Sequence, residues 1–256
     1  MPPVLTILKK RWQEVLLIAI LGSGIFIPSM LLGLNDAAGQ EPEVSEWSLF
    51  AMVAGVTFFA VFYVMITMGF LETAYREGTY QQDPAKLLII GRRFFWRMLR
   101  FNIIIGLVSS VIIFAFYVVI HRMILQLPPD EAPSVWVQQI SAFFTSIIVA
   151  RPVLLIPPIF ITTGTNEALK AFSLSKKFPV KSMVGPIVIY VVCQAVANGL
   201  MQAWPLMKDT GPIRYIPLAV IGVAAGLLFF VPYLPAMKYI TERMPSPPER
   251  EDPGNE

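Results

Sequence analysis

The sequence predicts an all-α polytopic membrane protein with six transmembrane helices. Of its 256 residues, 55% are hydrophobic and only 14% are charged, and the mean hydropathy is +0.64. A soluble globule of this length needs more polar side chains to cover its surface. The apolar residues fall into six runs, each long enough to cross a hydrocarbon layer of ~30 Å.

We expect a single transmembrane domain over residues 1–244 and a disordered cytoplasmic tail over residues 245–256, which is rich in proline and charge. The first apolar run follows a basic segment, as in a signal peptide, but it lacks a small-residue cleavage site and is long for one, so we expect a retained span. The six spans are expected at about 15–34, 47–71, 101–120, 136–161, 183–204 and 215–237.

Two basic amphipathic helices are expected between spans, over about 84–100 and 166–181. Asp83 followed by Pro84 is a good helix start, with the acid as N-cap and proline at the first helical position. On the first helix the cations form one stripe and apolar residues the opposite one, which predicts a helix in the headgroup plane. The cations expected to contact the lipid surface are Lys86, Arg93, Arg97, Arg100, Lys176 and Lys177.

An internal repeat relates the two basic segments. Residues 83–94 align without a gap on residues 167–178, 84 positions later. An acid, a lysine three residues on, two adjacent cations and a phenylalanine recur in register. Each copy lies between two apolar runs, so we interpret the chain as two parallel repeats of span, cytoplasmic amphipathic helix and span.

This pattern, with the segment over residues 167–178, resembles the membrane domain of bacterial glycerophosphodiester phosphodiesterases and related stand-alone six-span proteins of unknown function. The resemblance covers most of residues 10–240. In that family the phosphodiesterase activity belongs to a separate soluble domain. The resemblance therefore implies a membrane fold and no phosphodiesterase activity for this chain.

The distribution of cations predicts the orientation. Of the 20 Lys and Arg residues, 16 fall on the side of the termini and the basic helices, whereas Arg122, Lys208 and Arg214 fall on the other side. The positive-inside rule then places both termini in the cytoplasm, and we expect the plasma membrane, specifically a bacterial inner membrane. The basic pI of about 9.0 follows from this asymmetry, and no nucleic-acid partner is expected.

We expect no enzymatic activity, because the sequence lacks H-E-x-x-H, G-x-S-x-G and G-x-x-x-x-G-K motifs. The single cysteine, Cys193, and the single histidine, His121, leave too few ligands for a zinc or haem site. No cofactor and no metal are expected.

Arg151 is the one charge well inside a predicted span, where an unpaired cation is costly. One hypothesis is a structural role, in which Arg151 reaches the headgroups or pairs with Glu72. The other is a site for an anionic lipid headgroup, supported by Pro152, Pro157 and Pro158, which free backbone carbonyls within the span.

Polar side chains form a stripe on the predicted fifth span, where Gln194, Asn198 and Gln202 lie at spacings of four. Gln138, Ser141 and Thr145 form a similar stripe on the fourth predicted span. Such stripes must face protein or water, so they indicate either hydrogen bonds between helices or a polar cavity between the two spans.

Two functions remain open at this point. The first is a non-catalytic integral membrane protein of envelope or lipid homeostasis, acting as a scaffold for partner proteins and bound to membrane lipids with anionic headgroups. The second is a small transporter or lipid-handling protein that uses the polar cavity between spans four and five.

Overall fold

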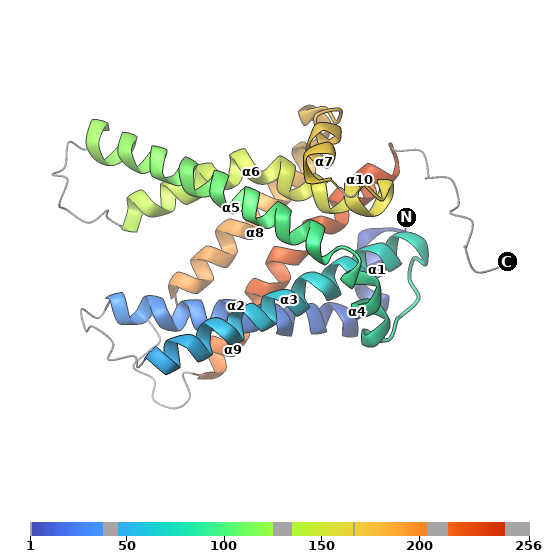
Figure 1. Cartoon of the computed structure of the whole chain (residues 1–256), viewed down its shortest axis with the longest axis horizontal. Coiled ribbons are helices and arrows are strands. Elements are labelled where there is room, and N and C mark those ends of the chain that lie inside the picture. Colours follow the sequence, from blue (N-terminus) through green and yellow to red (C-terminus); the bar gives the residue numbers. More distant parts are fainter. Residues whose placement is uncertain (1, 38–45, 125–134, 166, 204–214, 244–256) are drawn as a thin grey trace.

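The computed structural model describes residues 2–37, 46–124, 135–165, 167–203 and 215–243, which are helical and contain no strand (Figure 1). The long helices are α2 (Trp12–Ala37), α3 (Glu46–Arg76), α5 (Phe95–Tyr117), α6 (Val135–Thr163), α8 (Val184–Ala203) and α9 (Tyr215–Phe230). The short ones are α1 (Val4–Lys10), α4 (Pro84–Arg92), α7 (Ala168–Ser175) and α10 (Tyr233–Thr241), with a π-helical segment at Val118–Ile124 and a 3-10 turn at Val180–Met183.

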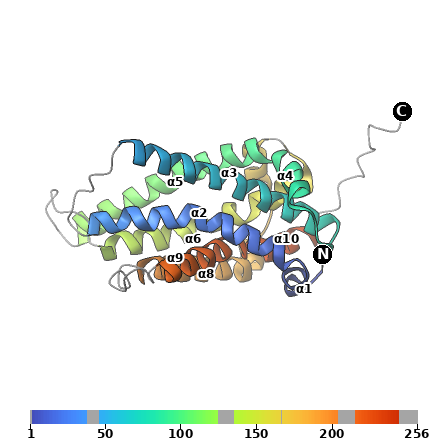
Figure 2. The same ribbon diagram turned by 90° about the horizontal axis from the view of Figure 1, so that it is seen from below.

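The short helices α1, α4, α7 and α10 gather at one end of the molecule, and the long helices extend away from that end (Figures 1 and 2). We call this the polar end, because the basic segments predicted to be cytoplasmic lie there. The predicted tail over residues 245–256 lies outside the described residues.

Among the residues that the structure describes, four helical segments are long and apolar enough to span a membrane: Phe50–Arg76, Phe95–Ile120, Ile140–Thr163 and Ile216–Thr241. The last of these joins α9 to α10 across a break at Pro232. Helices α1 and α2 give a fifth candidate, bent by 86°, and the apolar part of α8, Val184–Leu200, is shorter. The structure therefore confirms an all-helical membrane protein, whereas the count of six spans stays a prediction.

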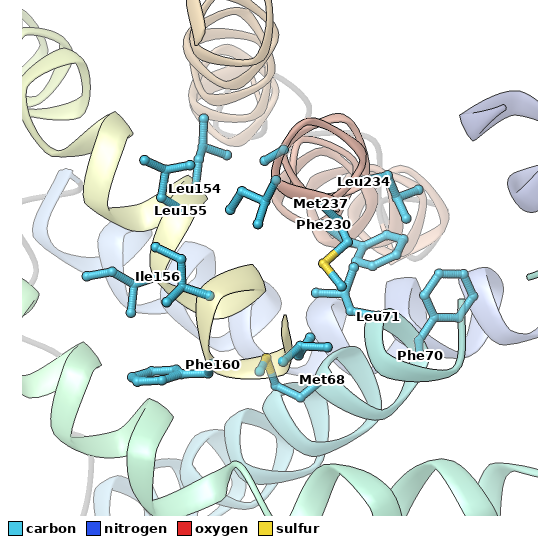
Figure 3. Close-up of a cluster of buried hydrophobic side chains, with 14 of the residues drawn as sticks. Met68, Phe70, Leu71, Leu154, Leu155, Ile156, Phe160, Phe230, Leu234 and Met237 are labelled. Carbon is cyan, nitrogen blue, oxygen red and sulfur yellow. The ribbon is translucent and has the colours of Figure 1, made fainter. Parts of the chain in front are cut away.

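The hydrophobic core lies between α3, α6 and the α9–α10 pair, as the close-up in Figure 3 shows. The rings of Phe70 and Phe230 pack edge to face, with centroids 5.2 Å apart. Fully buried side chains from the three elements include Met68, Leu71, Leu154, Phe160, Leu234 and Met237. Farther from the polar end, α3 and α5 expose large apolar side chains, which in a bilayer meet lipid.

Glycines allow two helix pairs to pack with their backbones in contact. A Cβ at Gly22 of α2 would lie 2.6 Å from the Cα of Gly226 of α9. Between α3 and α4, a Cβ at Gly69 would overlap the carbonyl of Leu87, and one at Gly91 would overlap the carbonyl of Met65. Small residues of this kind are what close helix packing in membranes requires. Helix α4 is thus packed tightly against α3 rather than resting only on lipid.

The predicted basic helix over 84–100 is wrong as a single element. Helix α4 ends at Arg92, the chain turns at Arg93 and Phe94, and α5 begins at Phe95. Phe94 is buried, with 5% of its surface exposed, and burying such a ring contributes about 1.5–3 kcal/mol. The turn that buries Phe94 therefore removes Lys86 from the stripe that was expected to include Arg97 and Arg100.

The predicted helix over 166–181 is also shorter than expected, because α7 ends at Ser175. Lys176 and Lys177 lie in the turn after it, Phe178 is buried, and Pro179 follows. A residue that precedes proline is disfavoured in the helical region, so the sequence Phe178-Pro179 explains why the helix stops before this point.

Candidate functional site at the polar end

Arg11 lies at the bend between α1 and α2 and is completely buried. Its Nε donates to both carboxylate oxygens of Glu14, at 3.0 Å each, and its Nη2 donates to Glu14 and, at 2.8 Å, to the hydroxyl of Thr73. The guanidinium carbon lies 4.2 Å from the centroid of the Phe70 ring. These contacts join the N-terminal bend to α3.

Glu14, which is 3% exposed, extends the same cluster to the loop between α3 and α4. The backbone N–H of Gln82 donates to its Oε1 at 2.8 Å. We call Arg11, Glu14, Thr73 and Gln82 the N-terminal clamp. Because breaking a buried ion pair leaves an uncompensated charge, the clamp fixes the geometry of the polar end.

The clamp was not predicted from the sequence, where Arg11 counted only among the 16 cations on the side of the termini and the basic helices. The available signal was an arginine and a glutamate three residues apart at the start of a long apolar run. That spacing places both side chains on one face of a helix.

Arg151 contacts α7. Its Nη2 donates to the backbone carbonyl of Ser175 at 2.8 Å and to that of Phe178 at 2.9 Å. These carbonyls lie at the C-terminal end of α7, where the helix dipole and the unpaired carbonyls favour a cation. Arg151 is half-buried, and its Nε has no hydrogen-bond partner within the part of the chain that the structure describes.

The predicted ion pair between Arg151 and Glu72 is wrong. Glu72 is buried on α3, and its Oε1 accepts a hydrogen bond from Arg76, one turn later on the same helix, at 3.0 Å. Arg151 instead finds carbonyls on the short helix that directly follows its own. The hypothesis that Arg151 holds an anionic lipid headgroup stays a prediction.

The two polar stripes lie on α6 and α8. Gln194 is buried and Asn198 is half-buried, whereas the side chain of Gln202 lies outside the described part. Ser141 and Thr145 are buried, and their hydroxyls donate to carbonyls one turn back on α6, at 2.8 and 2.7 Å. These two hydroxyls are therefore satisfied within their own helix and do not link α6 to α8.

Exposed cations cluster at two turns of the polar end. We call them the basic corners: Arg92 and Arg93 with Trp96 form the first, and Lys176 and Lys177 with Phe172 form the second. Trp96 is 66% exposed and Phe172 41%. No ion pair of these four cations is seen among the described residues, whereas the predicted lipid-contacting Lys86 pairs with Glu77 at 3.3 Å.

Two open grooves adjoin the short helices. The first, of about 420 Å³, lies between α5 and α7 and is lined by Arg100, Ile103, Ile104, Glu167, Ala168 and Leu169. The second, of about 450 Å³, lies between α1, α8 and α10 and is lined by Pro3, Val4, Leu5, Pro186, Pro235, Lys238, Tyr239 and Glu242. In the described ranges, no three His, Cys, Asp or Glu side chains are grouped so as to hold a metal ion.

The polar end thus combines buried charges, which contact neighbouring helices, with exposed cations, of which Lys176 lies over the exposed Phe172 ring. Comparison with protein-family models, with curated proteins and with solved structures gave no match.

Proposed function

We propose that this protein is a non-catalytic integral membrane protein of envelope or lipid homeostasis, whose polar end binds the anionic lipid surface and presents a scaffold to partner proteins. Both termini and the polar end lie on the cytoplasmic side in this proposal. The membrane is a bacterial inner membrane.

The observation that carries the proposal is that each basic corner combines two exposed cations with an exposed aromatic side chain. Exposed Trp96 suits the headgroup depth of a bilayer, where tryptophan is enriched, and the exposed Phe172 ring, whose centroid lies 5.6 Å from the Nζ of Lys176, adds an aromatic side chain at the second corner. The four cations form no ion pair with an acid among the described residues. Each cation near an anionic membrane surface contributes about 1 kcal/mol to binding.

The two corners also support the parallel repeat within this proposal. Leu87 and Gly91 are buried in α4, and Ala171 and Ser175, each 84 positions later, are buried in α7. Phe94 and Phe178, related by the same offset, are each 5% exposed. Matched burial at matched positions is what a duplicated span, short helix and span unit would give, and in this proposal each copy carries one basic corner.

The resemblance to the membrane domain of glycerophosphodiester phosphodiesterases belongs to the same proposal and is supported by the sequence pattern. A second candidate function, a small transporter or lipid-handling protein, is favoured by one observation. Gln194 lies within the apolar helix α8 and is 9% exposed, and no hydrogen bond of its amide to a described residue is seen. A polar side chain in an apolar span must face protein or water, so it is compatible with a polar cavity.

Hydrogen exchange in lipid nanodiscs tests the proposal. Replacing Arg92, Arg93, Lys176 and Lys177 together with glutamine should speed exchange at the two corners in nanodiscs with anionic lipid, and change it little in neutral ones. The matched control is Lys86→Gln, because Lys86 is already paired with Glu77. An equal change in both kinds of nanodisc would mean that the four cations serve protein contacts, and would refute the lipid-binding role.

A further inference from the structure

We propose that the groove between α5 and α7 is a binding site for a single zwitterionic phospholipid whose headgroup ends in a primary amine, as in phosphatidylethanolamine. Arg100 binds the phosphate, Glu167 binds the ammonium, and the apolar wall holds the start of an acyl chain. This site goes beyond the proposed function, since it selects one headgroup rather than a charged surface.

The charges in the groove are complementary to a zwitterion. Arg100 and Glu167 both line it, and both are exposed. Neither side chain forms a hydrogen bond or ion pair within the part of the chain that the structure describes, although they face the same groove. Glu167 is the N-cap residue of α7, yet its carboxylate caps no N–H of that helix. One cation and one anion therefore stay available to a ligand that carries both charges.

The groove combines charged and apolar side chains along α5. Ile103 and Ile104 follow Arg100 by three and four residues on α5, which is about 4.5 and 6 Å along the helix at 1.5 Å per residue. Together with Leu169 of α7 they form the apolar wall, and Arg100 and both isoleucines lie within the candidate span Phe95–Ile120. In this proposal the charged rim lies at headgroup level, and the apolar wall lies at the level of the glycerol and the first methylene groups.

The lining also discriminates between headgroups. An anionic lipid that lacks an amine, such as phosphatidylglycerol, would bring its phosphate to Arg100 but would offer the Glu167 carboxylate a neutral glycerol in place of a cation, so the charge of Glu167 would stay uncompensated. A choline headgroup carries its positive charge on a nitrogen without N–H groups, so it cannot donate a hydrogen bond to Glu167. Proteins bind such quaternary ammonium groups with aromatic rings, and no residue that lines this groove is aromatic. A primary ammonium satisfies the carboxylate.

Native mass spectrometry of the full chain can measure this selectivity. The protein is released from nanodiscs that contain equal amounts of phosphatidylethanolamine, phosphatidylcholine and phosphatidylglycerol, and the retained lipids are counted. We expect phosphatidylethanolamine to be retained over phosphatidylcholine by roughly fivefold, the ratio that a charge-assisted contact near the surface of a protein gives. Glu167→Gln should reduce this ratio to near one, and Glu167→Asp should restore most of it.

The remaining variants separate the site from its surroundings. Arg100→Gln should lower retention of phosphatidylethanolamine and phosphatidylcholine alike, because it removes the phosphate contact. Arg93→Gln is the matched control, since Arg93 lies outside the groove, and should leave the ratio unchanged. The variant in which Arg92, Arg93, Lys176 and Lys177 are all replaced with glutamine should also leave the ratio of retained phosphatidylethanolamine to phosphatidylcholine unchanged. Failure of the surface-binding proposal is therefore distinguishable from failure of the groove proposal.

Three results would overturn the proposal. They are equal retention of the two zwitterionic lipids by the unmodified protein, preferential retention of phosphatidylglycerol, and a Glu167→Gln variant that keeps the full preference. The first two need no variant, so the proposal stays testable even if a substitution in the groove impairs folding.

Discussion

Replacing Arg151 with methionine tests whether this residue anchors α7. The change removes two hydrogen bonds from a charged donor, to the carbonyls of Ser175 at 2.8 Å and Phe178 at 2.9 Å. Each contributes about 1.5 kcal/mol at the lower end of the range for charged groups, or about 3 kcal/mol together. Removing a cation from this depth recovers at least ~2.5 kcal/mol of insertion cost, so the global free energy of unfolding should change by less than about 1 kcal/mol.

The effect should therefore be local. Without the two hydrogen bonds from Arg151, the free energy of local opening of α7 should fall by most of about 3 kcal/mol. This corresponds to roughly hundredfold faster hydrogen exchange of its amides. Hydrogen exchange read by mass spectrometry over peptides covering α7 measures this directly. Arg151→Lys should give an intermediate rate, because a single ammonium reaches the two carbonyls less well than the planar guanidinium.

The control variant is Arg76→Met, which removes an exposed partner of Glu72 on α3 and should leave exchange in α7 unchanged. Unchanged exchange of α7 in Arg151→Met would refute the anchoring role. A double-mutant cycle of Arg151→Met with Glu72→Gln should be additive within about 0.5 kcal/mol, as expected for sites that share no contact. Strong coupling between the two substitutions would instead indicate a direct ion pair between Arg151 and Glu72, which the structure does not contain among its described contacts.

Two further substitutions test the α3–α4 packing and the N-terminal clamp, each by the free energy of unfolding in detergent micelles. Gly91→Ala should destabilise the protein by about 1–3 kcal/mol, because the new methyl group overlaps the carbonyl of Met65. The control Gly106→Ala, which has open space around it, should be neutral. Equal effects of the two substitutions would contradict the tight α3–α4 contact. Glu14→Gln should cost about 3–5 kcal/mol, because it leaves the fully buried Arg11 without a counter-charge. A cost below about 1 kcal/mol, as expected for an exposed ion pair, would show that the clamp contributes little.

The membrane class and the approximate positions of the long helices could be predicted because they depend on composition and run length alone. The last predicted span is interrupted, because the chain turns between Phe230 and Tyr233, where Pro232 lies. In contrast, Pro152, Pro157 and Pro158 lie inside α6, which continues as one helix over Val135–Thr163. A proline only removes one hydrogen bond, and packing against neighbouring helices decides whether the helix breaks there.

The ends of the short helices could not be predicted, because they depend on tertiary contacts. The cation stripe over 84–100 fits an uninterrupted helix, yet burial of Phe94 and the contact at Gly91 turn the chain after Arg92. The periodicity of one segment contains no information about the surface of α3 against which Gly91 packs. The same limit applies to Arg151, whose partners are backbone carbonyls and so carry no side-chain signal in the sequence.

The N-terminal clamp shows the opposite case, in which a local signal existed but its meaning depended on a distant segment. Arg11 and Glu14 are three residues apart, and such pairs are common on exposed helices, where they contribute little. Only the positions of Thr73 and Gln82, which come from the end of α3 and the loop after it, make this pair a buried one. A count of charges along the sequence could not distinguish an exposed Arg11–Glu14 pair from a buried one.

The proposed function requires the polar end to lie in the cytoplasm, and cysteine labelling can determine its side of the membrane. In a chain whose buried Cys193 is replaced by serine, single cysteines are placed at Ala85, which is exposed at the start of α4, and at Gln40 and Gly211 in the predicted outer loops. An impermeant maleimide should label Gln40→Cys and Gly211→Cys in sealed cells, and Ala85→Cys only after the membrane is permeabilised. Labelling of Ala85→Cys in sealed cells would place the basic corners outside and contradict the account.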